Sequence, residues 1–137
     1  MFWRYELFVP LMMCLSAFAW FGHGAVTQRE AKKYFTFALG TLLIASLILL
    51  VLLTVFIPLL EGHTQSLSIA HLALTLVGIV AAHLFAVVPT ALTLYSFGAH
   101  WPREVHLGAA IGMSAVATFF LPRAMVVFGC ALLRDCL

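Results

Sequence analysis

Residues 34–60 read YFTFALGTLLIASLILLVLLTVFIPLL and contain no charged side chain. A helix of roughly 20 predominantly apolar residues is long enough to cross the hydrocarbon core of a bilayer. This stretch therefore predicts a transmembrane helix. Three further apolar stretches, over about residues 5–26, 67–97 and 105–133, have the same character. Together they predict an all-α integral membrane protein with about four transmembrane helices.

Composition supports this prediction. The chain has 137 residues, of which 64% are hydrophobic and 9% are charged, whereas soluble domains are about half apolar and about a quarter charged. A soluble domain of this size could not bury so much apolar surface. Four spans with short connections use the whole length, so we predict that residues 1–137 form a single polytopic transmembrane domain with no soluble domain.

Several residues mark the predicted helix boundaries. Thr27-Gln-Arg-Glu30 matches a capping box, which predicts that the second helix begins at Thr27 and continues to Leu60. Gly98 is expected to end the third helix in the left-handed conformation. Pro89 and Pro122 each remove a backbone hydrogen bond, so the third and fourth helices are predicted to be Pro-kinked.

The charges at the helix ends indicate an orientation. Met1–Ala25 resembles a signal peptide, but Trp3, Tyr5 and Glu6 suit an interfacial anchor better, and we interpret it as a retained first span. The positive-inside rule predicts that both termini face away from the cytoplasm, or from the matrix in a mitochondrion. This orientation follows from the count of basic residues at the span ends. One side of the membrane has Arg29, Lys32, Lys33 and Arg103, and the other side has Arg4 and Arg134. We expect the chain to be located in the mitochondrial inner membrane or a bacterial inner membrane.

His71 and His83, both in the third span, are the candidate cofactor-binding residues. A neutral imidazole can ligate haem iron or transfer protons. It can equally form a structural hydrogen bond to a facing helix, and this alternative is favoured. The two side chains are about 18 Å apart along one helix, so they cannot ligate the same iron. Haem is therefore kept only as an alternative, and no other cofactor is expected.

Arg123 is the candidate lipid-headgroup residue. If the fourth helix crosses the bilayer between Val105 and Leu121, Arg123 lies at the far interface and reaches phospholipid phosphate, with cardiolipin as one candidate. If the helix continues straight, Arg123 is buried and needs an acidic partner, for which Glu6 and Glu61 are the nearest candidates. We favour the interfacial position.

The remaining polar residues indicate no catalytic or metal site. His23, His100 and His106 fall near one face of the membrane, but without metal-ligand spacing they are interpreted as solvated histidines. No nucleotide-binding, protease or hydrolase motif is present, which predicts a protein that is not an enzyme. The three cysteines predict no disulfide framework. A net charge of +2 without a basic face predicts no nucleic-acid binding.

Small residues recur every four positions on two helices, at Gly78, Ala82 and Ala86 and at Gly108 and Gly112. Such stripes are typical of helix contacts within membranes, and packing within the chain would account for both. The preferred hypothesis is a noncatalytic accessory subunit that packs against other membrane subunits and binds lipid in a large energy-transducing complex, such as a respiratory complex or ATP synthase. The alternatives are a haem- or quinone-binding membrane anchor and a small homo-oligomeric channel or carrier.

Overall fold

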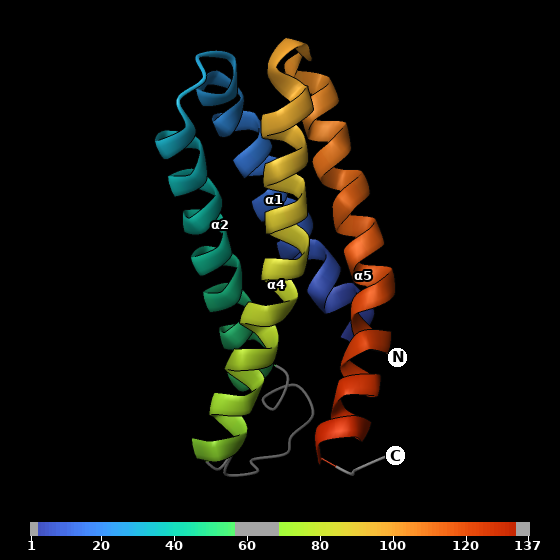
Figure 1. The fold of residues 1–137 in the computed structure, drawn as a ribbon. Coiled ribbons are helices and arrows are strands. Elements are labelled where there is room, and N and C mark those ends of the chain that lie inside the picture. The colour runs from blue at the N-terminus through green and yellow to red at the C-terminus, as the bar shows by residue number, and fades with distance from the viewer. Residues whose placement is uncertain (1–2, 57–68, 134–137) are drawn as a thin grey trace.

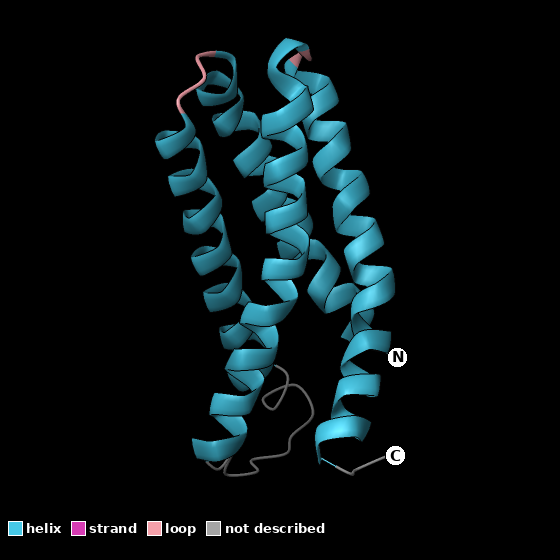
Figure 2. Ribbon diagram, viewed as in Figure 1, coloured by secondary structure: helices cyan, strands magenta, loops and turns pink. Residues whose placement is uncertain are grey.

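The computed structural model describes residues 3–56 and 69–133, with side chains described for residues 8–56, 69, 72–73, 75–120, 123 and 127. Within these ranges the chain consists of helices and short connections, without strands (Figure 2). The elements are α1 (Trp3–Thr27), α2 (Ala31–Val51), the π-helical η1 (Leu52–Phe56), α4 (Ile69–Phe97), the 3-10 helix η2 (Gly98–His100) and α5 (Arg103–Leu133). The four long helices confirm the all-α prediction.

Three stretches among the described residues are long and apolar enough to cross a membrane: Phe8–Thr27, Ala31–Phe56 and Thr75–His100. They correspond to the predicted spans 5–26, 34–60 and 67–97 and support an integral membrane protein. The predicted fourth span, 105–133, coincides with α5. Because α5 is not one of these three stretches, its crossing of the bilayer stays a prediction.

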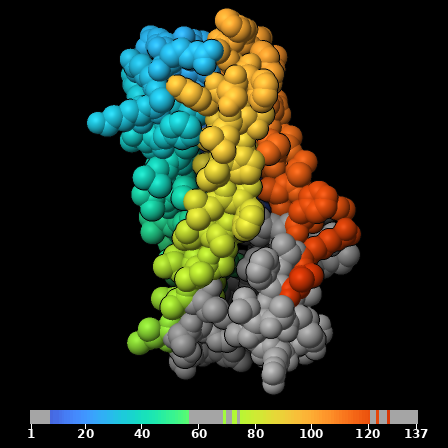
Figure 3. Space-filling view, in the orientation of Figure 1, coloured from blue at the N-terminus to red at the C-terminus, as the bar shows by residue number. Residues whose placement is uncertain are grey.

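The four long helices form an antiparallel bundle (Figure 1). The α1–α2 connection and the α4–α5 connection lie together at the top of Figure 1. Both α1 and α4 pack against α2 and α5, and the space-filling view shows α2 and α4 side by side (Figure 3). The end of the bundle that contains these two connections, which we call the loop end, therefore brings together residues that are far apart in the sequence.

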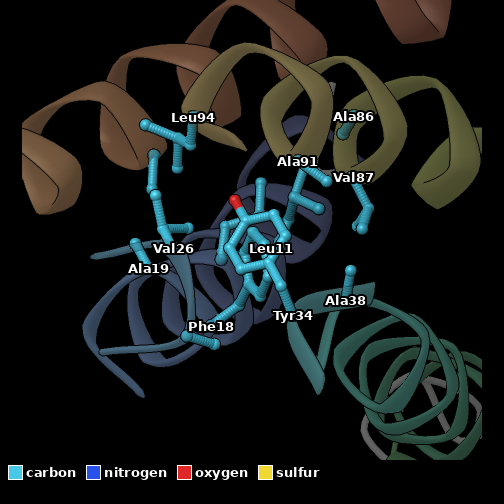
Figure 4. Close-up of a cluster of buried hydrophobic side chains, with 13 residues drawn as sticks. Leu11, Phe18, Ala19, Val26, Tyr34, Ala38, Ala86, Val87, Ala91 and Leu94 are labelled. Atoms are coloured by element: carbon cyan, nitrogen blue, oxygen red, sulfur yellow. The ribbon is translucent and has the colours of Figure 1, made fainter. Parts of the chain in front are cut away.

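The core is centred on the aromatic ring of Tyr34, which is fully buried. Its centroid lies 5.0 Å from that of Phe18 on α1 and 5.5 Å from that of Tyr95 on α4. Leu94 of α4 and Ala110 of α5 complete a cluster to which all four helices contribute (Figure 4). Because lipid is itself apolar, close packing of this kind, rather than exclusion of water, holds membrane helices together.

The capping box predicted at Thr27 is wrong. Thr27 is the last residue of α1, and its hydroxyl donates back to the carbonyl of Gly24 over 2.9 Å. The Glu30 side chain forms no capping hydrogen bond, and α2 begins only at Ala31.

A Schellman motif takes the place of the capping box. The N–H of Arg29 donates to the carbonyl of Val26 at 3.1 Å, and that of Glu30 donates to the carbonyl of Ala25 at 2.9 Å. This pattern requires a residue in the left-handed conformation directly after the helix, and Arg29 adopts it with a φ of 57°. The Thr-x-x-Glu pattern was misleading because the end of α1 determines the backbone there.

The ends of the two middle helices differ in part from the predictions. The segment after Val51 continues as η1 to Phe56, and residues 57–60 of the predicted second span lie outside the described residues. Helix α4 ends at Phe97 as predicted, but Gly98 opens a 3-10 turn and does not adopt a left-handed φ. Pro89 lies inside α4 and Pro122 inside the range of α5, and a kink at either proline stays a prediction.

Candidate functional site

The histidine at the middle of α4, His83, is 1% exposed. Its Nδ1 lies 2.7 Å from the carbonyl oxygen of Ile79, one turn earlier in the same helix. A carbonyl only accepts, so Nδ1–H is the donor and Nε2 carries the lone pair. This Nε2 is buried and has no hydrogen-bond partner among the described residues. The side chain is therefore held in the tautomer that can accept a hydrogen bond or bind a metal through Nε2.

A second buried polar atom lies at a similar level on α2. The hydroxyl of Ser46 is buried and has no hydrogen-bond partner in the described part of the chain. Tyr34 and Tyr95 are in contact across α2 and α4, and Ser46 and His83 each lie about 18 Å from that contact along their own helices. Helices α2 and α4 therefore each carry, at a similar level, a buried polar group without a hydrogen-bond partner among the described residues.

The other candidate cofactor residue, His71, lies in the first turns of α4, and its side chain is outside the described set. Its place on the same helix as His83 agrees with the predicted separation of about 18 Å. Cofactor binding by either histidine stays a prediction.

Arg123 is exposed on α5, and its guanidinium lies 4.5 Å from the centroid of the Phe119 ring. Helix α5 continues past this position to Leu133, and the Arg123 side chain lies on the outer surface of the described bundle. Its depth in a bilayer and its contact with a lipid headgroup stay predictions. Arg103, at the start of α5, lies about 30 Å away along the helix axis, which matches the thickness of the hydrocarbon core.

The loop end of the bundle contains a histidine cluster that the sequence did not predict. His106 of α5 is fully buried, and its Nε2–H donates to the carbonyl of Gly98 over 2.7 Å. The Nε2–H of His23, on α1, donates to the carbonyl of Trp101 over 2.9 Å. The two imidazole rings meet edge to face with centroids 4.7 Å apart. These contacts link α1, η2 and α5, and we call the four residues the histidine latch.

Glycine is required at one position in the histidine latch. A Cβ atom on Gly98 would lie 2.6 Å from Nε2 and 2.9 Å from Cε1 of His106, distances that no side chain tolerates. Beside the latch, the guanidinium of Arg103 lies over the ring of Trp20, 4.8 Å from its centroid. The N-terminal turn of α5 is thereby held against α1.

The interpretation of His23, His100 and His106 as solvated histidines is wrong for His106, which is buried; His23 is half-buried and His100 is exposed. The chain places His23 and His106 in contact, which their common membrane face alone did not predict. Among the described residues, no group of three or more His, Cys, Asp or Glu side chains could hold a metal ion. The sequence signal for the latch is Gly98, although the sequence alone predicted only that this glycine ends the third helix.

The two small-residue stripes have different environments. On α4, Ala82 and Ala86 are buried inside the bundle. On α5, Gly108 and Gly112 are exposed, and a Cβ atom at either would meet nothing within 4 Å. The inner face of α5 instead carries Ala110 and Ser114. Packing within the chain therefore accounts for the stripe on α4 but not for the one on α5.

The described residues form a four-helix bundle with three helices apolar and long enough to span a bilayer, which supports an integral membrane protein. Searches against protein-family models, curated proteins and solved structures find no match to this chain.

Proposed function

We propose that this chain is a noncatalytic accessory subunit of a larger membrane complex, of the energy-transducing kind, in which it packs against other subunits and binds lipid. The observation that carries the proposal is the outward-facing small-residue face of α5. Gly108 and Gly112 lie one above the other about 6 Å apart on the surface of the bundle, with open space where their side chains would be.

This face differs from the outer face of α2. The exposed side chains of α2 are large and aliphatic, including Leu39, Leu43 and Leu47, which suits contact with lipid chains. Exposed glycines give lipid little to pack against, but they let another helix approach closely enough for backbone contact. The α5 face therefore suits a helix of a neighbouring subunit.

Native electrophoresis of the chain extracted from its own membrane in mild detergent tests the proposal. We expect a particle far larger than a few copies of a 15.0 kDa chain, and we expect Gly108→Leu with Gly112→Leu to release the chain from it. Gly40→Leu is the matched control. A Cβ at Gly40 also meets nothing within 4 Å, but Gly40 lies on α2 and not on the α5 face. A small homo-oligomer, or a particle unaffected by the double substitution, would contradict the proposal; a homo-oligomer that passes solute after reconstitution would support the channel or carrier alternative.

A second candidate function is a haem- or quinone-binding anchor, favoured by the buried Nε2 of His83, which has no hydrogen-bond partner among the described residues. Metal-bound histidines usually donate their other ring N–H to a carbonyl or carboxylate, and Nδ1–H of His83 already donates to the carbonyl of Ile79. The absorbance spectrum of the purified protein tests haem: a Soret band lost in His83→Ala would support it. A colourless preparation containing no quinone would contradict this candidate.

A further inference from the structure

The histidine latch at the loop end of the bundle is built from two imidazole rings whose neutral tautomers are fixed by their hydrogen bonds. Gly98 and Trp101 offer carbonyl oxygens to Nε2 of His106 and His23 respectively. Because both carbonyls accept, both rings carry a proton on Nε2, and Nδ1 is the atom that would take a second one.

A second proton on His106 has no place in the closed bundle. Its Nδ1 is buried and has no hydrogen-bond partner among the described residues. A buried donor without an acceptor is costly, and a buried charge without a counter-ion costs more. The closed latch therefore requires the neutral form of His106.

The groups around His106 do not offset a positive charge. From α1 it faces His23, whose own protonation would add a like charge with the ring centroids 4.7 Å apart. From η2 it faces the uncharged carbonyl of Gly98, and from the loop it faces the ring of Trp101, whose centroid lies 6.2 Å from its own. The charged side chains described at this end are all exposed on the surface: Arg29, Glu30, Lys32, Lys33, Arg103 and Glu104, of which Glu30 pairs with Lys33 at 3.5 Å and Arg103 lies over Trp20.

We propose that the histidine latch is a pH-dependent switch that holds the loop end of the bundle closed at neutral pH and opens it in acid. Protonated His106 escapes burial only by turning toward water, which breaks its hydrogen bond to Gly98. The first turn of α5 then loses its attachment to η2 and its ring contact with His23 on α1.

The direction of the pH dependence follows from proton binding. A histidine in the open or unfolded chain titrates near a pKa of about 6.5, whereas the closed latch binds no second proton on His106. The open form therefore takes up more protons, and the closed form is progressively lost as the pH falls below about 6.5. One such group lowers the ratio of closed to open forms by about tenfold for each further pH unit.

Equilibrium unfolding of the full chain in mixed micelles between pH 7.5 and 5.0, followed by circular dichroism, tests the switch. The informative variant is His106→Gln, because the glutamine Nε2–H can replace the donor to Gly98 but cannot titrate. His100→Gln, an exposed histidine close by in η2, is the matched control. The buried His83 remains in every variant, so the difference between variants isolates the latch.

We expect the unfolding equilibrium constants of the wild-type chain and of His100→Gln to change equally as the pH falls. For each pH unit below about 6.5, the change in the equilibrium constant of His106→Gln should be smaller by a factor of about ten. Equal shifts in all three would overturn the proposal. If His106→Gln does not fold, the ¹³Cε1 resonance of His106 in the wild-type chain decides. A neutral ring that becomes protonated only as the bundle opens supports the switch, and a ring protonated inside the closed bundle overturns it.

Discussion

Replacing Gly98 by alanine is the smallest change that should break the histidine latch. The added Cβ would lie 2.6 Å from Nε2 of His106, so one of the two must move. The ring is poorly placed to do so, because it is fully buried, donates to the carbonyl of residue 98 over 2.7 Å and is covered on one side by His23. The substitution should therefore push the ring off its acceptor.

The expected cost has two unfavourable parts and one favourable part. Overpacking a closed site costs about 1–3 kcal/mol, and a buried hydrogen bond left unmade costs about 1–3 kcal/mol. Restricting the unfolded chain by replacing glycine with alanine returns about 0.4–1 kcal/mol. Taking the middle of each range, we expect Gly98→Ala to lower the free energy of unfolding by about 3 kcal/mol, which is about a 150-fold change in the unfolding equilibrium.

Mixed-micelle unfolding followed by circular dichroism measures this loss. Gly112→Ala is the control, since its Cβ meets nothing and alanine should stabilise a helix interior by about 0.5–1 kcal/mol. In a His106→Ala background the clash is removed, so Gly98→Ala should there be close to neutral. The reasoning is refuted if Gly98→Ala is neutral in the wild-type chain, or costs the same with and without His106.

Three further predictions follow from single contacts. Arg29→Gly should raise the free energy of unfolding by about 0.5–1 kcal/mol, because Arg29 has a φ of 57° that costs an L-residue about 1–2 kcal/mol. The control Lys32→Gly, in the first turn of α2, should instead lower the free energy of unfolding by about 1 kcal/mol. Equal effects of the two substitutions would contradict this prediction. Tyr34→Phe should be neutral or stabilising by up to about 1 kcal/mol, because the hydroxyl it removes is buried without a partner among the described residues; a loss above about 1 kcal/mol would reveal one. Cysteines replacing Arg103 and Arg123 in a cysteine-free chain should react with an impermeant maleimide from opposite sides of the membrane, and labelling from one side would show that α5 does not cross it.

The sequence predicted the helices well because bilayer thickness sets their length. Four apolar stretches gave four helices, and the predicted end of the third at Phe97 and start of the fourth at Val105 agree with α4 and α5 to within two residues. The start of α2 was predicted wrongly at Thr27, because the hydroxyl that could cap a new helix instead bonds back to Gly24 in the old one. A capping pattern is a local signal, and here the Schellman motif at the end of α1 determines the backbone of the turn.

The candidate site was harder to predict because burial depends on which face of a helix turns inward. His83 was singled out as a polar residue at membrane depth, and it is buried with an unused Nε2. His106 was missed because it lies close to a helix end, where histidines are usually solvated. Its burial comes from the approach of His23 on α1 and of Gly98 on η2, two contacts that no spacing within α5 could indicate.

Polar residues show which face of a membrane helix turns inward better than apolar residues do, because lipid accepts leucine as readily as a protein core does. His106 and Ser114 on α5, His83 on α4 and Ser46 on α2 are all buried, and each marks the face that meets the bundle. Threonine is a weaker guide, since its hydroxyl can bond to its own helix, as exposed Thr36 does to the carbonyl of Lys32. By this criterion the inner face of α5 could have been identified from its histidine and serine, and the glycines left on its outer face would have indicated a partner outside the chain.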